Sequence, residues 1–251
     1  MSMQCSDVEE GGGAVESPPP PSSSSSSLRL RSIESTLVIR QLPSHGLSFQ
    51  LWPAAAALVA LLDNPPISIS SLFVSTSGRL RLLELGSGTG LVGIAAAALL
   101  GADVTVTDLA HVLPNLQFNI NANAASLALR GGVVKAAHLP WGDLQRMEDL
   151  DLDLEYDVIL GSDVVYHDHL YDPLIQTLRF FLLGNGNGNG KRKSGVFLMA
   201  HLKRWKKESA FFRKARKFFD VQAVHTDSPV NGSRLGVTVY KFVRKELAIA
   251  C

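Results

Sequence analysis

From Leu80 onward, short apolar runs alternate with longer stretches of helical pattern. The apolar runs predict strands near 80–85, 103–107, 133–137, 156–161, 196–201, 219–225 and 236–243, and the stretches between them predict helices near 90–100, 111–126, 170–183 and 203–218. Strands separated by helices indicate a parallel sheet with crossover connections. Only the turn-forming segment Asp227–Arg234 separates the last two strands, which is too short for a helical crossover. The expected fold is therefore α/β, with seven strands of which the last is antiparallel.

The chain before this sheet predicts a smaller extension. Thr36–Arg40 is typical of a strand, and a Pro-Ser-His-Gly turn and a second extended piece follow it, so we expect an N-terminal hairpin beside the main domain. A helix should begin at Pro53, because proline suits the first helical position, and run to about Leu62. Residues 67–78 are expected to form a loop.

Residues 1–27 differ in composition from the rest of the chain. They contain runs of glycine, proline and serine and almost nothing apolar, so we expect a disordered tail, with one folded domain over residues 28–251. The tail lacks the basic and apolar regions of a signal peptide, and its acidic residues argue against a plastid transit peptide.

Overall composition excludes several functional classes. A formal net charge of +1 gives no reason to expect nucleic-acid or membrane binding. The apolar runs are shorter than the roughly 18 residues of a membrane span. The two cysteines, Cys5 and Cys251, make neither a disulfide framework nor a metal site, which favours a reducing intracellular setting and predicts no metal.

The main candidate for ligand binding is the phrase Glu84-Leu-Gly-Ser-Gly-Thr-Gly90, directly after the first strand of the main sheet. Glycines permit positive φ and let a ligand approach the backbone, and the amides that open the next helix can receive an anionic group. A dinucleotide pattern fits only if it starts at Gly88, three residues beyond the strand. Starting at Gly86, the phrase resembles the first motif of S-adenosylmethionine (AdoMet) methyltransferases.

Asp108 ends the next strand, close to the interval of about 20 residues at which an acid meets ribose hydroxyls. AdoMet and NAD both carry a ribose, so Asp108 does not choose between them, and an aspartate there could instead cap the following helix. The reversed last strand favours AdoMet, because dinucleotide dehydrogenases usually continue parallel to their sixth strand.

Three further stretches carry candidate chemistry. Trp141 follows the third strand and offers a flat face for an adenine, worth roughly 1–3 kcal/mol, although a tryptophan in a turn also packs for stability. Trp52 could close the same pocket from the other side. The fourth strand ends in Asp163-Val-Val-Tyr166, without the prolines of methyltransferases that act on adenine or glutamine.

Together, these motifs resemble the family 16 protein-lysine methyltransferases, close to the methyltransferase-like 21 group, over roughly residues 34–245. The resemblance implies a Rossmann-like class I methyltransferase fold and transfer of a methyl group from AdoMet to a lysine amine of an intracellular protein. It also implies a set of cofactor contacts, namely Trp52, Gly86, Ser87, Gly88, Asp108, Trp141 and Ser162. Asp163 and Tyr166 match the catalytic, substrate-side signature, where we expect them to position the reacting groups.

Other stretches of the sequence bear on the substrate. The serine-rich tail and the exposed Asn/Gly loop near 184–193 leave the protein substrate undecided. The many lysines and arginines of 203–217 suit a solvated helix face or an acidic protein partner. The alternatives are a small-molecule or nucleic-acid acceptor, a non-catalytic AdoMet-binding module and, less favoured, an NAD-dependent dehydrogenase. We expect a monomer in the cytoplasm, with the nucleus as a second location.

Overall fold

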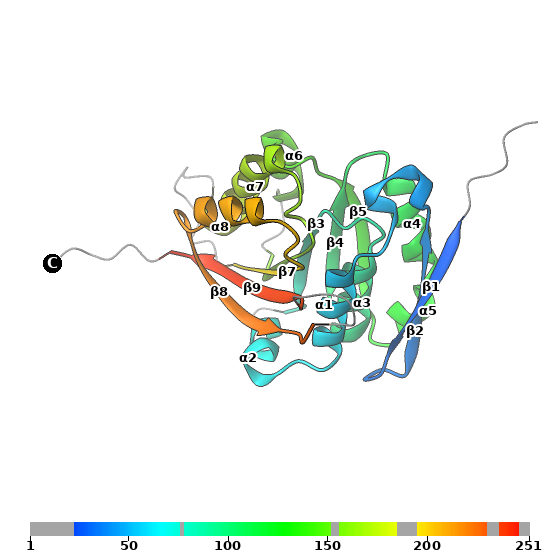
Figure 1. The fold of residues 1–251 in the computed structure, drawn as a ribbon. Coiled ribbons are helices and arrows are strands. Elements are labelled where there is room, and N and C mark those ends of the chain that lie inside the picture. The colour runs from blue at the N-terminus through cyan, green and yellow to red at the C-terminus, as the bar shows by residue number, and fades with distance from the viewer. Residues whose placement is uncertain (1–22, 76–77, 152–155, 185–194, 230–235, 246–251) are drawn as a thin grey trace, which may run out of the picture.

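A computed structural model describes residues 23–75, 78–151, 156–184, 195–229 and 236–245. Its centre is a seven-stranded sheet with the order β5-β4-β3-β6-β7-β9-β8 (Figure 1). The strands are β3 (Arg81–Leu85), β4 (Asp103–Asp108), β5 (Val133–His138), β6 (Val158–Ser162), β7 (Val196–His201), β8 (Phe219–Thr226) and β9 (Thr238–Arg244). All seven predicted strands are present, and β9 runs antiparallel to both β7 and β8. The predicted fold class is confirmed.

Helices cover both faces of this sheet, because the strand side chains alternate between two apolar cores. Leu82 and Leu160 belong to one core, whereas Leu83 and Ile159 belong to the other. The first core is shared with α1 (Pro53–Asp63), α3 (Leu91–Leu100), α4 (Leu113–Ala122) and α5 (Ala124–Ala128). The second is shared with α6 (Leu144–Asp151), α7 (Tyr171–Leu183) and α8 (Ser209–Ala215).

The N-terminal hairpin exists, but its strands differ from those predicted. Strand β1 (Ser24–Leu30) pairs antiparallel with β2 (Ser35–Gln41). Residues 24–27 are therefore part of a strand and not of a disordered tail, so the predicted boundary after residue 27 was wrong. The segment after the Pro-Ser-His-Gly turn, expected to be extended, forms a 3₁₀ turn at Leu47–Phe49. Residues 1–22 lie outside the described residues.

Asn119 of α4 and Asn123 at its C-cap form hydrogen bonds with the edge of β2 that does not face β1. The Val38 amide donates to Asn123 Oδ1 (2.9 Å) and the Arg40 amide donates to Asn119 Oδ1 (2.8 Å). The two amide groups donate in return to the carbonyls of Val38 (2.9 Å) and Arg40 (3.1 Å). Residues four apart on a helix share one face, so this spacing matches alternate residues of a strand and fixes the hairpin to the main domain.

Several helix boundaries also differ from the prediction. The helix expected near 111–126 divides at Asn123, and the one near 203–218 is shorter, with a 3₁₀ turn at Lys206–Glu208 followed by α8. The expected loop at 67–78 contains α2 (Ile67–Ser70) and a further 3₁₀ turn, and α6 was not predicted. Most of the Asn/Gly loop falls outside the described residues. In the described part of the chain, no single helix is long and apolar enough to cross a membrane, and α1 meets that test only jointly with the segment Ile67–Phe73, across a 94° bend.

Candidate functional site

One cavity of about 360 Å³ lies at the carboxyl ends of the central strands. The sheet register creates it, because Leu85 pairs with both Thr107 and Gly161, so that Gly86, Asp108 and Ser162 follow at the same edge. The structure brings together in its lining every site residue predicted from the sequence, namely Trp52, Gly86, Ser87, Gly88, Asp108, Trp141, Ser162, Asp163 and Tyr166.

Two glycines of the loop after β3 are required by close contacts as well as by backbone shape. Gly86 has φ 61°, and a Cβ there would lie 2.9 Å from Cζ2 of Trp141. Gly88 has φ 54°, and a Cβ there would lie 2.9 Å from the carbonyl oxygen of Ser48. Left-handed conformations suit glycine, and a side chain at either position would displace a wall of the cavity. The local geometry agrees with the expected close approach of a ligand to this backbone.

Asp108 holds this glycine loop and does not cap a helix. Its Oδ2 accepts from the Gly88 amide (2.8 Å) and its Oδ1 from the Leu109 amide (2.7 Å). Helix α4 begins at Leu113 with Val112 at its N-cap and no side-chain capping bond, so the cap alternative is wrong. Burial raises the pKa of the Asp108 carboxyl, although both amides oppose the rise. Each carboxylate oxygen keeps a lone pair for a further donor.

Ser87 makes two hydrogen bonds to Thr107 near the end of β4. The Thr107 amide donates to the Ser87 hydroxyl oxygen (3.0 Å), and the Ser87 amide donates to the Thr107 carbonyl (2.9 Å). These bonds attach the glycine loop to the end of β4. The buried hydroxyl therefore serves the loop itself.

Glu84 is a second buried carboxyl in the cavity lining, and the sequence reasoning did not assign it a role. It is 1% exposed, and its Oε2 accepts from the Gly93 amide in the first turn of α3 (2.9 Å). Burial raises the pKa of Glu84 to about 8. A cation bound in the cavity would favour the ionised form of this carboxyl.

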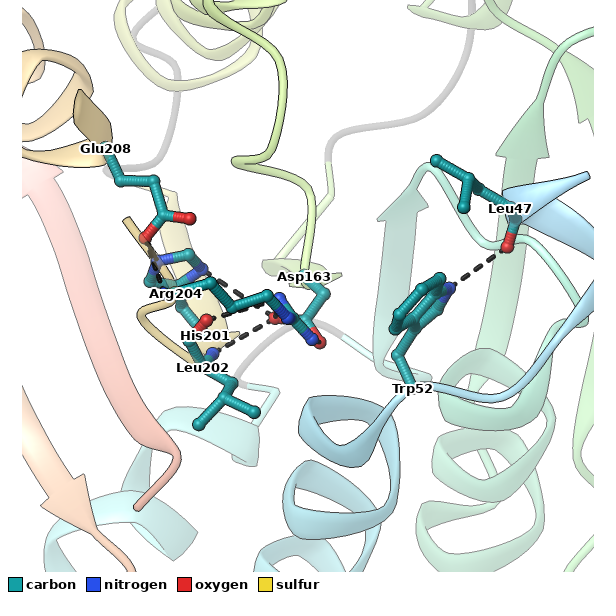
Figure 2. Close-up of polar contacts among 7 residues, drawn as sticks. All are labelled: Leu47, Trp52, Asp163, His201, Leu202, Arg204 and Glu208. Atoms are coloured by element: carbon teal, nitrogen blue, oxygen red, sulfur yellow. Dashed lines mark hydrogen bonds and ion pairs between the residues drawn. The ribbon is translucent and has the colours of Figure 1, made fainter. Parts of the chain in front are cut away.

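The two tryptophans come from stretches of the chain that are far apart in the sequence. Trp52 precedes α1, and its indole Nε1 donates to the Leu47 carbonyl (3.0 Å), which fixes the ring against the 3₁₀ turn (Figure 2). Trp141 follows β5 and lies against Gly86. Both residues line the cavity.

Asp163 is paired with an arginine that the sequence analysis did not single out. Arg204 donates to both oxygens of Asp163, from Nη1 to Oδ1 (3.1 Å) and from Nη2 to Oδ2 (2.9 Å), and the Leu202 amide also donates to Oδ1 (3.0 Å) (Figure 2). The guanidinium lies 5.3 Å from the centre of the Trp52 ring. Arg204 had been counted among the basic residues of a solvated helix, but it lines the cavity. Asp163 was chosen partly because it lies just past the end of a predicted strand. Arg204 also lies shortly after a predicted strand, so the same reasoning would have indicated Arg204.

Behind this pair lie two further buried groups, His201 at the end of β7 and Glu208. Glu208 Oε2 lies 3.1 Å from His201 Nε2 and also accepts from the Arg204 amide (3.1 Å). Burial lowers the pKa of His201, although the nearby carboxylates oppose the shift. The neutral form agrees with the geometry, since His201 Nδ1 makes no hydrogen bond among the described residues and its nearest carboxylate oxygen, Asp163 Oδ1, lies 3.7 Å away, beyond hydrogen-bond distance.

Tyr166 is the half-buried phenol of the site. Burial raises its pKa above the ordinary value, with Asp108 as a second cause, so the hydroxyl stays protonated near neutral pH. The ring contacts His167 with a centroid distance of 4.8 Å. No hydrogen bond from its hydroxyl occurs within the described part of the chain, which leaves that group available to a ligand.

These features fit the AdoMet predicted from the sequence. The cavity offers two indole faces for an aromatic base, a buried carboxylate for hydroxyl donors, and a loop whose glycines present main-chain atoms. Its volume lies within the range of about 300–1,000 Å³ typical of sites for ligands of this size. The described residues contain no group of three or more His, Cys, Asp or Glu side chains that could hold a metal ion.

Comparison with known proteins identifies the family. A family model described as lysine methyltransferase matches residues 32–218. Protein N-lysine methyltransferase METTL21A of Danio rerio is 34% identical over 203 residues, which cover 80% of this chain and 79% of that protein. EEF1A lysine methyltransferase 3 of Mus musculus is 30% identical over 206 residues, which cover 82% of this chain and 76% of that protein.

Solved structures agree on the fold. A predicted O-methyltransferase from Agrobacterium tumefaciens superposes with a TM-score of 0.51 at 16% identity, over 75% of this chain and 81% of that one. TYW2 of P. horikoshii in complex with MeSAdo superposes with a TM-score of 0.50 at 12% identity, over 84% of this chain and 69% of that one. The fold is therefore that of a Rossmann-like methyltransferase, and the chain belongs to the lysine methyltransferase family, as an AdoMet-dependent protein-lysine N-methyltransferase.

Proposed function

We propose that the cavity at the carboxyl edge of the sheet is where AdoMet and the target lysine of an intracellular protein meet. One observation carries the proposal: all nine residues chosen from the sequence line this single cavity, although they come from stretches far apart in the chain. The cofactor contacts would be Trp52, Gly86, Ser87, Gly88, Asp108, Trp141 and Ser162, and the acceptor side would be Asp163 and Tyr166.

The lining suggests which part of the cofactor each residue holds. Trp141 would take the adenine on its ring face, and Asp108 would accept from the ribose hydroxyls with its remaining lone pairs. The glycine loop and the amides that open α3 would receive the carboxylate of the amino-acid end. When bound, AdoMet supplies an electrophilic methyl group on a positively charged sulfur.

The acceptor lysine must present a neutral amine. Free lysine has a pKa of about 10.4, so neutralising it near pH 7.4 requires about 4 kcal/mol. Asp163 is not a free base, since both of its oxygens accept hydrogen bonds from Arg204. Tyr166 keeps its proton near neutral pH. These residues are therefore suited to orienting the amine and excluding water, and orientation alone can supply much of a rate enhancement.

The partner is a protein, as for the relatives, and its identity is open. One relative is named for EEF1A, which makes EEF1A a reasonable first candidate here. We further propose that the enzyme acts as a monomer in the cytoplasm, with the nucleus as a second location. The absence of a cysteine framework in the sequence supports an intracellular setting.

The decisive experiment uses labelled AdoMet with a cytosolic extract and, separately, with purified EEF1A. We expect an ε-methylated lysine, stable to mild base, identified by mass spectrometry. Label found only on arginine, carboxylates, nucleic acid or small molecules would contradict the lysine assignment.

A binding measurement tests the cofactor site separately. Calorimetry should show binding of S-adenosylhomocysteine and no tight binding of NAD. Asp108→Ala should weaken S-adenosylhomocysteine binding by roughly 1.5–3 kcal/mol, the usual contribution of hydrogen bonds to a charged group. Asp103→Ala is the control, because Asp103 lies at the start of the same strand and outside the cavity lining. Unchanged affinity in a folded Asp108→Ala protein would show that this carboxylate only supports the loop.

A further inference from the structure

The segment Lys203–Lys207 borders the cavity and carries lysines whose charge no carboxylate of the described residues neutralises. Arg204 and Trp205 line the cavity, and the three lysines of the segment lie within two residues of Trp205. The lysine side chains are exposed, and no carboxylate pairs with any of them within the described ranges. Lys207 only approaches the Trp205 ring, with Nζ 5.8 Å from its centre.

Two other basic residues of 203–217 are engaged with carboxylates, unlike these lysines. Arg204 binds Asp163, and Lys214 binds Asp172 with its Nζ 2.6 Å from Oδ2. Glu208 is the one acidic residue in 203–217, and it is fully buried, with its Oε2 directed to His201 and to the Arg204 amide. The carboxylate that could have neutralised this surface thus points inward (Figure 2).

The cavity lining also includes large apolar side chains that are exposed. Trp205 is 51% exposed, Leu47 is 47% exposed and Leu109 is 45% exposed, and all three line the cavity. Apolar side chains that rim a binding cavity, beside unpaired positive charge, suit a partner that offers apolar and acidic groups together.

We propose that Lys203, Lys206 and Lys207, with Trp205, Leu47 and Leu109, dock an acidic segment of the protein substrate that carries the target lysine beside an apolar residue. The inference rests on the proposed function, because it takes this border of the cavity as the entrance for the lysine. Charge complementarity selects the occupant: the lysines attract carboxylates, and the apolar rim excludes water around them. The apolar rim and a net charge of only +1 favour an acidic protein segment over a nucleic acid.

The test measures fluorescence anisotropy with three labelled probes and the full chain saturated with S-adenosylhomocysteine. The first probe is a peptide with one lysine and one leucine flanked by glutamates. The second is the same peptide with glutamines in place of the glutamates, and the third is a single-stranded oligonucleotide. Lys206→Glu/Lys207→Glu is the test variant. Arg29→Glu/Lys135→Glu makes the same change of charge at two exposed positions outside the cavity lining and is the control.

We expect the acidic peptide to bind at least about tenfold more tightly than the glutamine peptide, with the difference falling as salt is raised. The test variant should lose about tenfold in affinity for the acidic peptide, and the control should lose none. Equal binding of the two peptides, no binding of either, equal losses in the two variants, or preference for the oligonucleotide would each overturn the proposal.

A methylation assay on the same peptides separates this proposal from the proposed function. Binding of the acidic peptide without methylation of its lysine would contradict the placing of the acceptor in the cavity while leaving the docking surface intact. Methylation of both peptides with equal kcat/KM would contradict the docking surface while leaving the acceptor assignment intact.

Discussion

Asp163 has a backbone conformation that few residues other than glycine adopt, with φ 53°. Aspartate tolerates this region better than most residues, and here the Leu202 amide and the Arg204 guanidinium fix its side chain. Strained backbone of this kind concentrates at functional sites. The pair thus fixes the turn after β6 that leads to Tyr166 in the cavity lining, which is a positioning role.

Tyr166 provides the cleanest test of the acceptor side. Tyr166→Phe removes a hydroxyl that has no partner within the described residues, so turnover should fall about tenfold or more, equivalent to about 1.4 kcal/mol. Affinity for S-adenosylhomocysteine should change much less. Tyr171→Phe is the control, because the Tyr171 hydroxyl is buried outside the cavity and also has no hydrogen-bond partner among the described residues. Equal turnover in the two variants would remove Tyr166 from the proposed mechanism.

Glu84 should make stability depend on pH. Its folded-state pKa of about 8 lies above the ordinary value of 4.5, so the folded protein binds the proton more tightly than the unfolded chain. The stability from this group is present in full below pH 4.5 and is lost as the pH rises to about 8. Each pKa unit corresponds to about 1.4 kcal/mol, so the loss is on the order of several kcal/mol.

Glu84→Gln should flatten this pH dependence, measured by urea unfolding between pH 5 and pH 8. Glu148→Gln, at an exposed glutamate of α6, is the control and should retain the slope of the parent protein. If Glu84→Gln also retains that slope, the buried carboxyl does not control it. Asp108 has a pKa shift of the same sign and remains in both variants, so only the difference between them is interpreted.

At the scale of single residues, sequence reasoning found the cavity lining but not the groups that support it. Gly86, Asp108 and Ser162 were recognisable because each follows a strand that the apolar pattern locates. Arg204 follows a strand in the same way, but it was hidden in a run of basic residues whose usual place is a solvated surface. The Glu208 contact with His201 was beyond prediction, because it depends on how the chain turns after β7.

Among the elements, the hairpin is connected to the glycine loop through one asparagine. Asn119 holds the backbone of Arg40, and its Nδ2 also donates to the Thr89 carbonyl (2.9 Å). Asn119→Ala should therefore leave buried backbone groups unpaired and reduce the free energy of unfolding by about 1–3 kcal/mol. Asn121→Ala, at an exposed asparagine of the same helix, is the control. Equal unfolding midpoints for the two would contradict the connecting role.

The elements that were missed share a physical reason. The serines of β1 have little β propensity. They form a strand because Leu30 of the same segment is buried in the first core and Leu28 packs against that core. Helix α6 spans only eight residues with three apolar positions, Leu144, Met147 and Leu150, which is too short a pattern to identify a helix from the sequence. Tertiary contacts decide both cases, whereas the central strands were evident from their own apolar runs.

At the scale of the whole molecule, β9 joins the last hairpin to the rest of the sheet. Phe242 is fully buried there and contacts the rings of Phe197 and Phe219 from both neighbouring strands. Phe242→Ala should lower the free energy of unfolding by roughly 3–5 kcal/mol. Val243→Ala, at a half-buried residue on the opposite face, should lower it less. A similar loss in both would show that the aromatic contacts do not dominate.

The insertion of β9 between β7 and β8 also has a consequence for the behaviour of the protein in solution. Residues 197–201 of β7 are buried, and β9 pairs with that strand along Phe197–His201. If the β8–β9 hairpin detaches, an apolar interior strand becomes an open edge that can recruit the same strand of another molecule. We therefore expect intermolecular aggregation, begun by release of this hairpin, to limit the storage lifetime of the purified enzyme before its cofactor-binding half unfolds.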